Sequence, residues 1–294
     1  MSLFITGYSG FSGSHISNFL ADAGCTIFTL NRNNKKNTKQ HPNIIPLQGS
    51  LEDLERLPEN TETVIHIAAL SPTPGVSCDD LVRDNVRGTQ NLIRLSEQHK
   101  IKKFIFFSTL SVYGEVRDTI LTEESPIINP DSYGLTKLIG EQLLKEAKIE
   151  TRLVLRFPAI IGAGAKRHWL STTIEKALHN EEISFYNPSA EFNNAVHVRE
   201  LSFFIDNLVK LSWEGFDVIN LACNGSMTTQ EIIDKIVFMT HSSSHLKERK
   251  GNKNSFMIST KKAETLYGYQ PIPFEIAFET YLKEIMEKRK NENK

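Results

Sequence analysis

The chain opens with the stretch Leu3-Phe4-Ile5-Thr6-Gly7-Tyr8-Ser9-Gly10-Phe11-Ser12-Gly13, a short apolar run that leads into a turn with three glycines. The apolar run predicts a buried strand, and the apolar spacing from Phe11 to Asp22 predicts a helix directly after the turn. Glycines allow such a turn to be sharp, and they leave the free N–H groups of the helix N-terminus open to an anion such as a pyrophosphate. We therefore predict an anion-binding turn at the start of a parallel sheet.

The same alternation of apolar runs and helical patterns continues along the first half of the chain. Strands are predicted at Leu3 to Ile5, Thr26 to Leu30, Ile44 to Leu47, Val64 to Ile67, Phe104 to Ser108 and Arg152 to Arg156. Helices are predicted between them at Phe11 to Asp22, Leu81 to His99 and Asp131 to Lys148. This order indicates an α/β fold, a doubly wound parallel sheet of the Rossmann-like kind with helices on both faces.

The pattern loosens after Pro158, and we place a domain boundary there. Helices are predicted in the second half at Trp169 to His179, from the capping-box sequence Thr228-Thr-Gln-Glu231 to Thr240, and at Pro273 to Lys288. We therefore expect a dinucleotide-binding domain over residues 1–160 and a smaller, mainly substrate-binding C-terminal lobe over residues 161–294.

Composition excludes several classes of protein. Lys and Arg number 34 against 35 Asp and Glu, so net positive charge does not favour nucleic-acid binding. The longest apolar runs fall far short of the roughly 20 residues that span a bilayer, and no signal peptide is evident, so we expect a cytoplasmic protein without membrane contact. The three cysteines, Cys25, Cys78 and Cys223, lack disulfide or zinc spacing, and the pair His241 and His245 falls in a serine-rich loop. We predict no metal site.

A series of motifs resembles one enzyme family, the extended short-chain dehydrogenase/reductases, which include sugar-nucleotide epimerases, dehydratases and ketoreductases. The motifs follow the family's order: Thr6-Gly-x-x-Gly10-x-x-Gly13, His66-Ile-Ala68-Ala69, Asn85-Val-Arg-Gly-Thr89, Ser108-Thr109-Leu-Ser111-Val-Tyr113-Gly, Tyr133-x-x-x-Lys137 and Ala195-Val-His197-Val. The resemblance implies NAD(P)-dependent hydride transfer.

Tyr133 and Lys137 lie four residues apart on a predicted helix and therefore share one face, which suits an acid beside a cation. Thr109 follows the preceding strand, at the sheet edge where open α/β sheets bind ligands. The resemblance implies that Tyr133 is the general acid/base, that Lys137 also holds the nicotinamide ribose, that Thr109 binds the substrate oxygen and that Asn85 supports the site. We expect Lys137 and the positive nicotinamide ring to lower the pKa of Tyr133.

The cofactor site predicted from the turn and from the resemblance comprises Gly7, Gly10, Phe11, Gly13, Asn31, Arg32, Ser50, Leu51, Ala68, Ala69, Lys137 and Pro158. NAD enzymes usually carry an acid after the second strand, whereas this chain has Asn31 and Arg32 there, followed by Lys35 and Lys36. A guanidinium suits the 2′-phosphate of NADP, so NADP(H) is favoured and NAD(H) stays open.

The reaction is narrowed by the residues after Thr109. In the family's dehydratases an Asp and a Glu follow the threonine, but here Leu110 and Ser111 follow it, so dehydration is disfavoured. We predict an NAD(P)H-dependent reductase of a 4-keto-6-deoxy sugar nucleotide. The alternatives are an NAD-dependent sugar-nucleotide epimerase and, outside catalysis, an NAD(P)-sensing or scaffold protein.

The substrate and the assembly are less narrowly defined. Many relatives have a diphosphate-binding arginine where this chain has Asn193, and Lys166, Arg167 and Arg199 are candidate replacements. A small-molecule substrate, suspected to be a nucleotide sugar, is the expected partner, and a homodimer stays open.

Overall fold

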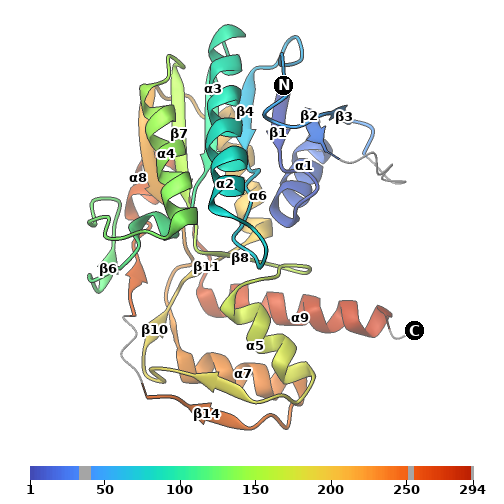
Figure 1. Cartoon of the computed structure of the whole chain (residues 1–294). Coiled ribbons are helices and arrows are strands. Elements are labelled where there is room, and N and C mark those ends of the chain that lie inside the picture. The colour runs from blue at the N-terminus through green and yellow to red at the C-terminus, as the bar shows by residue number, and fades with distance from the viewer. Residues whose placement is uncertain (33–40, 251–254, 293–294) are drawn as a thin grey trace.

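The computed structural model describes residues 1–32, 41–250 and 255–292, which form an α/β layer and a smaller part beneath it (Figure 1). Lys35 and Lys36 of the predicted basic loop lie outside these residues. Within them, no helix is both long and apolar enough to cross a membrane.

The α/β layer is built on a parallel sheet of seven strands with the order β12-β7-β5-β4-β1-β2-β3. In chain order the strands are β1 (Ser2–Thr6), β2 (Thr26–Asn31), β3 (Ile44–Gln48), β4 (Thr63–His66), β5 (Lys103–Phe107), β7 (Thr151–Arg156) and β12 (Gly215–Asn220). The central strands are apolar on both faces, and Phe4, Ile65 and Phe104 are fully buried. Helices must therefore cover both faces of the sheet.

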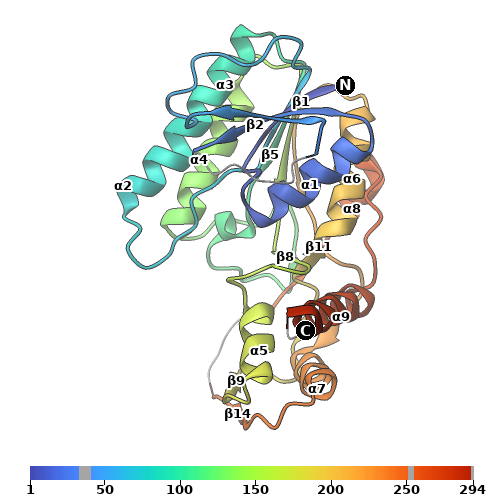
Figure 2. The same cartoon turned by 90° about the vertical axis from the view of Figure 1, so that its right-hand side faces the viewer.

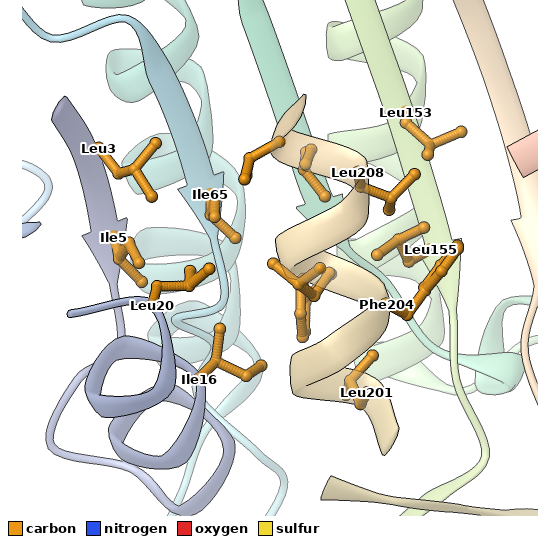
Figure 3. Packing of buried hydrophobic residues seen from close by; sticks show 14 of the residues in the cluster. Leu3, Ile5, Ile16, Leu20, Ile65, Leu153, Leu155, Leu201, Phe204 and Leu208 are labelled. Atoms are coloured by element: carbon orange, nitrogen blue, oxygen red, sulfur yellow. The ribbon is translucent and has the colours of Figure 1, made fainter. Parts of the chain in front are cut away.

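Two groups of helices provide that cover (Figure 2). One face carries α1 (Phe11–Asp22), α6 (Val198–Lys210) and α8 (Lys261–Tyr267), and the other carries α2 (Cys78–Leu81), the π-helix η1 (Val82–Arg87), α3 (Gly88–Gln98) and α4 (Ser132–Glu146). Figure 3 shows how α1 and α6 direct apolar side chains at the sheet. The helices contribute Ile16, Leu20, Leu201, Phe204 and Leu208, and the sheet contributes Leu3, Ile5, Ile65, Leu153 and Leu155.

The smaller part contains α5 (Trp169–Leu178), α7 (Thr229–Thr240) and α9 (Phe274–Glu292), which enclose an apolar core of their own. Four short strand pairs complete the structure: β8 (Ala159–Ile161) with β11 (Ala195–His197), β9 (Ile183–Phe185) with β14 (Leu246–Glu248), β10 (Glu191–Phe192) with β13 (Met227–Thr228), and β6 (Ile120–Leu121) with β15 (Met257–Ile258). The β8–β11 pair lies where the chain passes between the two parts (Figure 1).

The predicted fold class is confirmed: the chain is an α/β protein with a doubly wound parallel sheet and a smaller C-terminal part. Helices α6 and α8 and the strands of the four short pairs were not predicted from the sequence. Two further differences concern the elements of the sheet and the helix before β5. The helix predicted at Leu81 to His99 is interrupted by the π-helix η1, and the seventh strand, β12, was not predicted. β12 and α6 come from residues after 160, yet both pack on the sheet of the first part. The domain boundary at residue 160 stays a prediction.

Candidate active site

A cleft of about 1200 Å³ runs along the carboxyl edge of the sheet, between the α/β layer and the smaller part. It is lined by the residues that follow β1, β2, β4, β5 and β7 and by residues from the loop before α5. The carboxyl edge is where open parallel sheets bind ligands, because the strand-to-helix loops diverge there. The predicted cofactor residues that line it are Gly7, Gly10, Phe11, Gly13, Asn31, Arg32, Ser50, Leu51, Ala68, Ala69 and Pro158.

The glycine-rich turn is closed by backbone contacts that leave no space for side chains. Gly7 has a φ of +82°, and a Cβ there would lie 2.8 Å from the backbone nitrogen of Ala68. A Cβ on Gly13 would lie 2.0 Å from the carbonyl oxygen of Gly7. Gly10 is the N-cap of α1 and has no side chain to accept the N–H groups of the first turn. Those groups face the cleft and suit a pyrophosphate, so the turn fits a dinucleotide.

A buried histidine ties this turn to the neighbouring strand. The Thr6 hydroxyl accepts the backbone N–H groups of Ile67 and Ala68 at 3.1 and 3.0 Å, so its own proton points to Nδ1 of His66, 2.7 Å away. Nε2 of His66 therefore carries the ring proton and donates it to Thr89 at 2.8 Å. Burial, followed by the charge of Lys137, lowers the pKa of His66 well below its usual value, which keeps the ring neutral.

Asn85 is buried inside the π-helix η1 and is used for structural contacts. Its Oδ1 accepts the N–H of Leu70 at 2.7 Å, and its Nδ2 donates to the carbonyl of Leu70 and to the hydroxyl of Thr136 at 3.0 and 3.2 Å. Asn85 is not among the residues that line the described cleft. It therefore holds the loop after β4 against α4, which agrees with the supporting role expected for it and not with direct contact to a reactant.

Thr109 and Tyr133 both line the cleft. Thr109 caps the short helix η2 (Leu110–Tyr113): its Oγ1 accepts the N–H of Ser111 and donates to the Ser111 hydroxyl, both at 3.2 Å. Tyr133 stands in the first turn of α4, where a Cβ on Gly134 would lie 2.3 Å from the carbonyl of Ser111. This close approach of α4 to η2 brings the tyrosine and the threonine to one wall of the cleft.

Lys137 is fully buried next to this wall and is not among the residues that line the described cleft. Its Nζ lies 4.0 Å from the centroid of the Phe106 ring. Burial lowers the pKa of Lys137 to about 7, although the charge of Glu141 acts in the opposite direction. Burial and then the Asp131 carboxylate raise the pKa of Tyr133 to about 12. Without a bound dinucleotide, burial and Asp131 thus disfavour the phenolate of Tyr133. The expected lowering of this pKa by Lys137 and the nicotinamide ring together stays a prediction for the cofactor-bound protein.

A buried polar network supports the same wall from behind. Arg156, at the end of β7, pairs with Glu141 of α4 at 2.6 Å, and Glu141 also accepts the hydroxyl proton of Ser108, the residue before Thr109. The Arg156 guanidinium lies over the ring of Tyr113, whose hydroxyl donates to Asn220 of β12 at 2.9 Å. The network thus links β5, β7, β12 and α4 directly beneath Thr109.

At the outer end of the cleft, formed by the residues at the ends of β2 and β3, Arg32 is paired with a carboxylate. Its Nη1 lies 2.7 Å from Oδ2 of Asp84 in η1, and both side chains line the cleft. The guanidinium that was expected to meet a 2′-phosphate therefore already has an anionic partner. Ser50, the other candidate there, donates its hydroxyl proton to Asp53 at 2.6 Å.

The candidates for a substrate diphosphate fall into two groups. Asn193 is buried, and its amide bonds to the carbonyls of Cys223 and Ile258 and to the N–H of Ile258, so it is occupied by structural contacts. Lys166 and Arg167 are exposed and line the cleft from the loop before α5. Arg199 is exposed on α6 and lies outside the described lining of the cleft.

Sequence reasoning overlooked Asp84, Glu141 and the support that Arg156 provides. Glu141 and Arg156 carried one signal, since both are charged residues at positions that the apolar spacing assigns to buried faces. Asp84 carried none, because its partner Arg32 is 52 residues away in the sequence.

Comparison with known proteins agrees with this arrangement. The chain is 26% identical to a putative UDP-glucose 4-epimerase from Methanocaldococcus jannaschii, over 99% of each chain. The structure of UDP-glucuronic acid 4-epimerase from Bacillus cereus in complex with NAD has a TM-score of 0.82 at 21% identity, and the match covers 98% of this chain and 99% of that one. For UDP-glucose 4-epimerase from Thermotoga maritima with UDP-glucose, the TM-score is 0.81 at 20% identity, with 98% and 99% covered.

A family model also matches most of the chain. It is described as the NAD dependent epimerase/dehydratase family, and the match extends over residues 3–219, from β1 to β12. The name of the family refers to NAD, and the predicted preference for NADP(H) finds no support in these comparisons. The chain belongs to the NAD dependent epimerase/dehydratase family.

Proposed function

We propose that the protein is an NAD-dependent epimerase of a nucleotide sugar, which inverts a sugar hydroxyl by way of a transient ketone. The observation that carries this proposal is that Thr109 and Tyr133 line the same cleft as the glycine-rich turn. A dinucleotide bound at that turn and a sugar bound at that wall would share one enclosed space. The relatives named as UDP-glucose 4-epimerases support the choice of reaction and of substrate class.

Each residue at the wall has a role that its position suits. The Tyr133 phenolate would take the proton of the reacting sugar hydroxyl, and the Tyr133 hydroxyl formed in this way would return it after inversion, as a general base and then a general acid. The Thr109 hydroxyl, which now bonds to Ser111, turns to hydrogen-bond the same sugar oxygen. With NAD bound, the Lys137 cation and the positive nicotinamide ring together would stabilise the phenolate form of Tyr133. NAD would be held by Gly7, Gly10 and Gly13 of the turn and would supply the site that accepts and returns a hydride.

Dehydration does not suit the residues that follow Thr109. Leu110 packs against the apolar cluster around Val112 and Tyr113, and leucine transfers no proton. Ser111 lines the cleft but offers only a weakly acidic hydroxyl. Removing water from a sugar requires both an acid and a base in addition to Tyr133, so a reaction that needs only one proton carrier fits better.

Net reduction of a 4-keto-6-deoxy sugar nucleotide is the second candidate. It uses the same proton from Tyr133, and the absence of an acid directly after β2, where Asn31 and Arg32 stand, favours it. A binding protein that senses the dinucleotide without catalysis is less well supported, because Thr109 and Tyr133 line one wall of the cleft and Lys137 is present on the same helix as Tyr133.

The reaction is tested by incubating the purified protein with NAD⁺ and UDP-glucose, and separately with NADPH and a 4-keto-6-deoxy sugar nucleotide. Mass spectrometry separates the outcomes by the atoms each reaction gains or loses. We expect an epimer of unchanged mass and no net consumption of cofactor. A gain of about 2 mass units would establish the reductase instead, and a loss of about 18 would contradict the argument from Leu110 and Ser111. A dinucleotide-binding protein with no turnover on a panel of nucleotide sugars would contradict both enzyme proposals.

A further inference from the structure

The outer end of the cleft contains a carboxylate that the sequence does not place there. β2 ends in Asn31, and the turn after β1 lies beside it, so the adenosine half of a bound dinucleotide would lie over this end. Asp84, in the π-helix η1, brings to it a carboxylate that is bonded directly to Arg32. Asn31, Arg32, Ser50, Leu51 and Asp84 all line the same cleft.

Asp84 is held in place by two guanidinium groups. Its Oδ2 accepts from Nη1 of Arg32 at 2.7 Å, and its Oδ1 accepts from Nε of Arg83 at 3.2 Å. Arg83 pairs in turn with Asp80 at 2.9 Å, which fixes its position. The Asp84 side chain is only 11% exposed, whereas that of Arg32 is 53% exposed. Asp84 is therefore the fixed partner of the pair, and Arg32 is the partner that can move.

The charges around this end do not favour a phosphate. A recess of about 170 Å³ at the end of the cleft is lined by Arg32 and Arg83 but also by Glu52 and Asp84, together with Ser50, Leu51 and Gly88. Its described lining thus carries two positive and two negative groups, which offer no net attraction to a dianion. For Arg32 to serve a 2′-phosphate it would have to leave Asp84, and the phosphate would then face that carboxylate.

A ribose with a free 2′-hydroxyl neither requires Arg32 to leave Asp84 nor brings a negative charge close to that carboxylate. A hydroxyl donates a hydrogen bond to a carboxylate, and Asp84 can accept it while it keeps its bonds to Arg32 and Arg83, because a carboxylate has about four acceptor sites. This is the interaction that an acid at the end of the second strand usually makes in NAD enzymes. Here the acid would come from a different element, 52 residues further along the chain.

We propose that Asp84 determines the choice of dinucleotide: it holds Arg32 and accepts the free 2′-hydroxyl of the adenosine ribose, so that the protein binds NAD more tightly than NADP. The inference rests on the proposed function, because it assumes that a dinucleotide occupies the cleft.

The test compares the affinities of the full chain for NAD⁺ and NADP⁺ by isothermal titration calorimetry, which needs no turnover. The shorter probes AMP and adenosine 2′,5′-bisphosphate separate the adenosine end from the rest of the cleft. In the parent protein we expect NAD⁺ to bind at least about tenfold more tightly than NADP⁺, the factor typical of one charge-assisted hydrogen bond. The Asp84→Asn variant should reduce that ratio by about tenfold or more, since Arg32 is then free for the phosphate.

Two further variants assign the effect to the pair. The double variant Asp84→Asn with Arg32→Gln should lose the NADP⁺ affinity that Asp84→Asn gains. Asp79→Asn removes an equal charge from an exposed position on the neighbouring α2 and should leave the ratio unchanged. A melting curve for each variant checks that it is folded, and Asp84→Ser replaces Asp84→Asn if the asparagine variant does not fold.

A parent protein that binds NADP⁺ at least as tightly as NAD⁺ would overturn the inference without any variant. An Asp84→Asn variant with an unchanged ratio, or a ratio that Asp79→Asn changes equally, would overturn it as well. In both cases the proposed function would stand, since a dinucleotide still binds. Failure to bind either dinucleotide would contradict the proposed function together with the inference.

Discussion

The two ends of the cleft hold their charged groups in opposite ways. At the inner end, the Arg156–Glu141 pair is at most 7% exposed and belongs to a network that runs beneath Thr109. At the outer end, the Arg32–Asp84 pair leaves the Arg32 side chain 53% exposed. A buried pair cannot lose one partner without a large desolvation cost, whereas a guanidinium in solvent exchanges partners cheaply.

The difference suggests a division of roles along the cleft. The inner end has to keep a proton carrier within a fraction of an ångström of the reacting atom, so rigid buried support is useful there. The outer end only has to recognise a ribose, and a pair that exchanges partners can be altered by single substitutions. The following predictions test this contrast, from the largest expected effect to the smallest.

The largest effect is expected when the proton carrier of the inner end is removed. Tyr133→Phe should lower turnover by about 10²–10⁴-fold, the range for loss of a general acid/base, with little change in dinucleotide affinity. Steady-state rates and calorimetry measure the two quantities. Tyr281→Phe is the control: that tyrosine is buried in the smaller part, and its hydroxyl has no hydrogen-bond partner among the described residues. Equal rates for Tyr133→Phe and the parent would show that Tyr133 is not the proton carrier.

Breaking the inner pair should cost more stability than breaking any surface pair. Arg156→Met leaves the Glu141 charge buried without its partner and should lower the free energy of unfolding by about 3–5 kcal/mol. Urea titration measures this value. The pair Lys210–Asp206, whose lysine side chain is 58% exposed, is equally short, at 2.6 Å, yet Lys210→Met should cost less than about 1 kcal/mol because that lysine lies in solvent. Similar losses for the two variants would contradict the contrast between buried and exposed pairs.

The buried lysine should make stability depend on pH. Burial lowers the pKa of Lys137 to about 7 in the folded chain, whereas its ordinary value, which applies to the unfolded chain, is 10.5. Between these two pH values the unfolded chain binds more protons than the folded chain, so the free energy of unfolding rises with pH. Lys137→Met removes this contribution. The variant should therefore gain about 2–3 kcal/mol relative to the parent when unfolding is measured at pH 7 instead of pH 9.5. Lys145→Met, at an exposed position of α4, is the control and should show no such difference between the two pH values. If the difference in free energy of unfolding between Lys137→Met and the parent did not depend on pH, the prediction would be contradicted.

The smallest effect is expected at the outer end. Arg32→Gln should change the free energy of unfolding by less than about 1 kcal/mol, because the guanidinium is half in solvent and Asp84 keeps Arg83 as a partner. Urea titration in parallel with Arg156→Met makes the comparison direct. A loss as large as that of Arg156→Met would mean that the outer end is as rigidly built as the inner one.

The apolar runs predicted the first six strands of the sheet and most of the helices because burial on both faces makes a strand continuously apolar. β12 was missed because Asp217 stands in its middle, and a charge there hides the apolar pattern. In the structure Asp217 accepts from Lys262 and from Tyr267 of α8, which permits a carboxylate in a partly buried strand. These hydrogen-bond donors to Asp217 lie about 50 positions further along the chain, so a local sequence pattern does not reveal them.

The site shows the same limit. The glycine-rich turn, Thr109 and Tyr133 line one cleft, and each belongs to a short motif that can be read in the sequence. Asn85 and Lys137 were predicted from motifs too, but their burial depends on how η1 and α4 pack. The partner of Asp84 belongs to a distant element, so the sequence offered no means of placing it, whereas Glu141 was marked only by its charge at a buried helix position.

The position of β12 has a consequence for synthesis of the chain on the ribosome. β7 is complete at Arg156, but β12, its neighbour at the edge of the sheet, begins only at Gly215. At about 5–20 residues per second, the chain between them takes roughly 3–12 s to make. Throughout that interval the edge of β7 and the apolar face destined for α6 have no partner, and such an edge is a site for pairing between chains. The nascent protein would therefore be most prone to aggregation, and most in need of a chaperone, while residues 157–220 are being added.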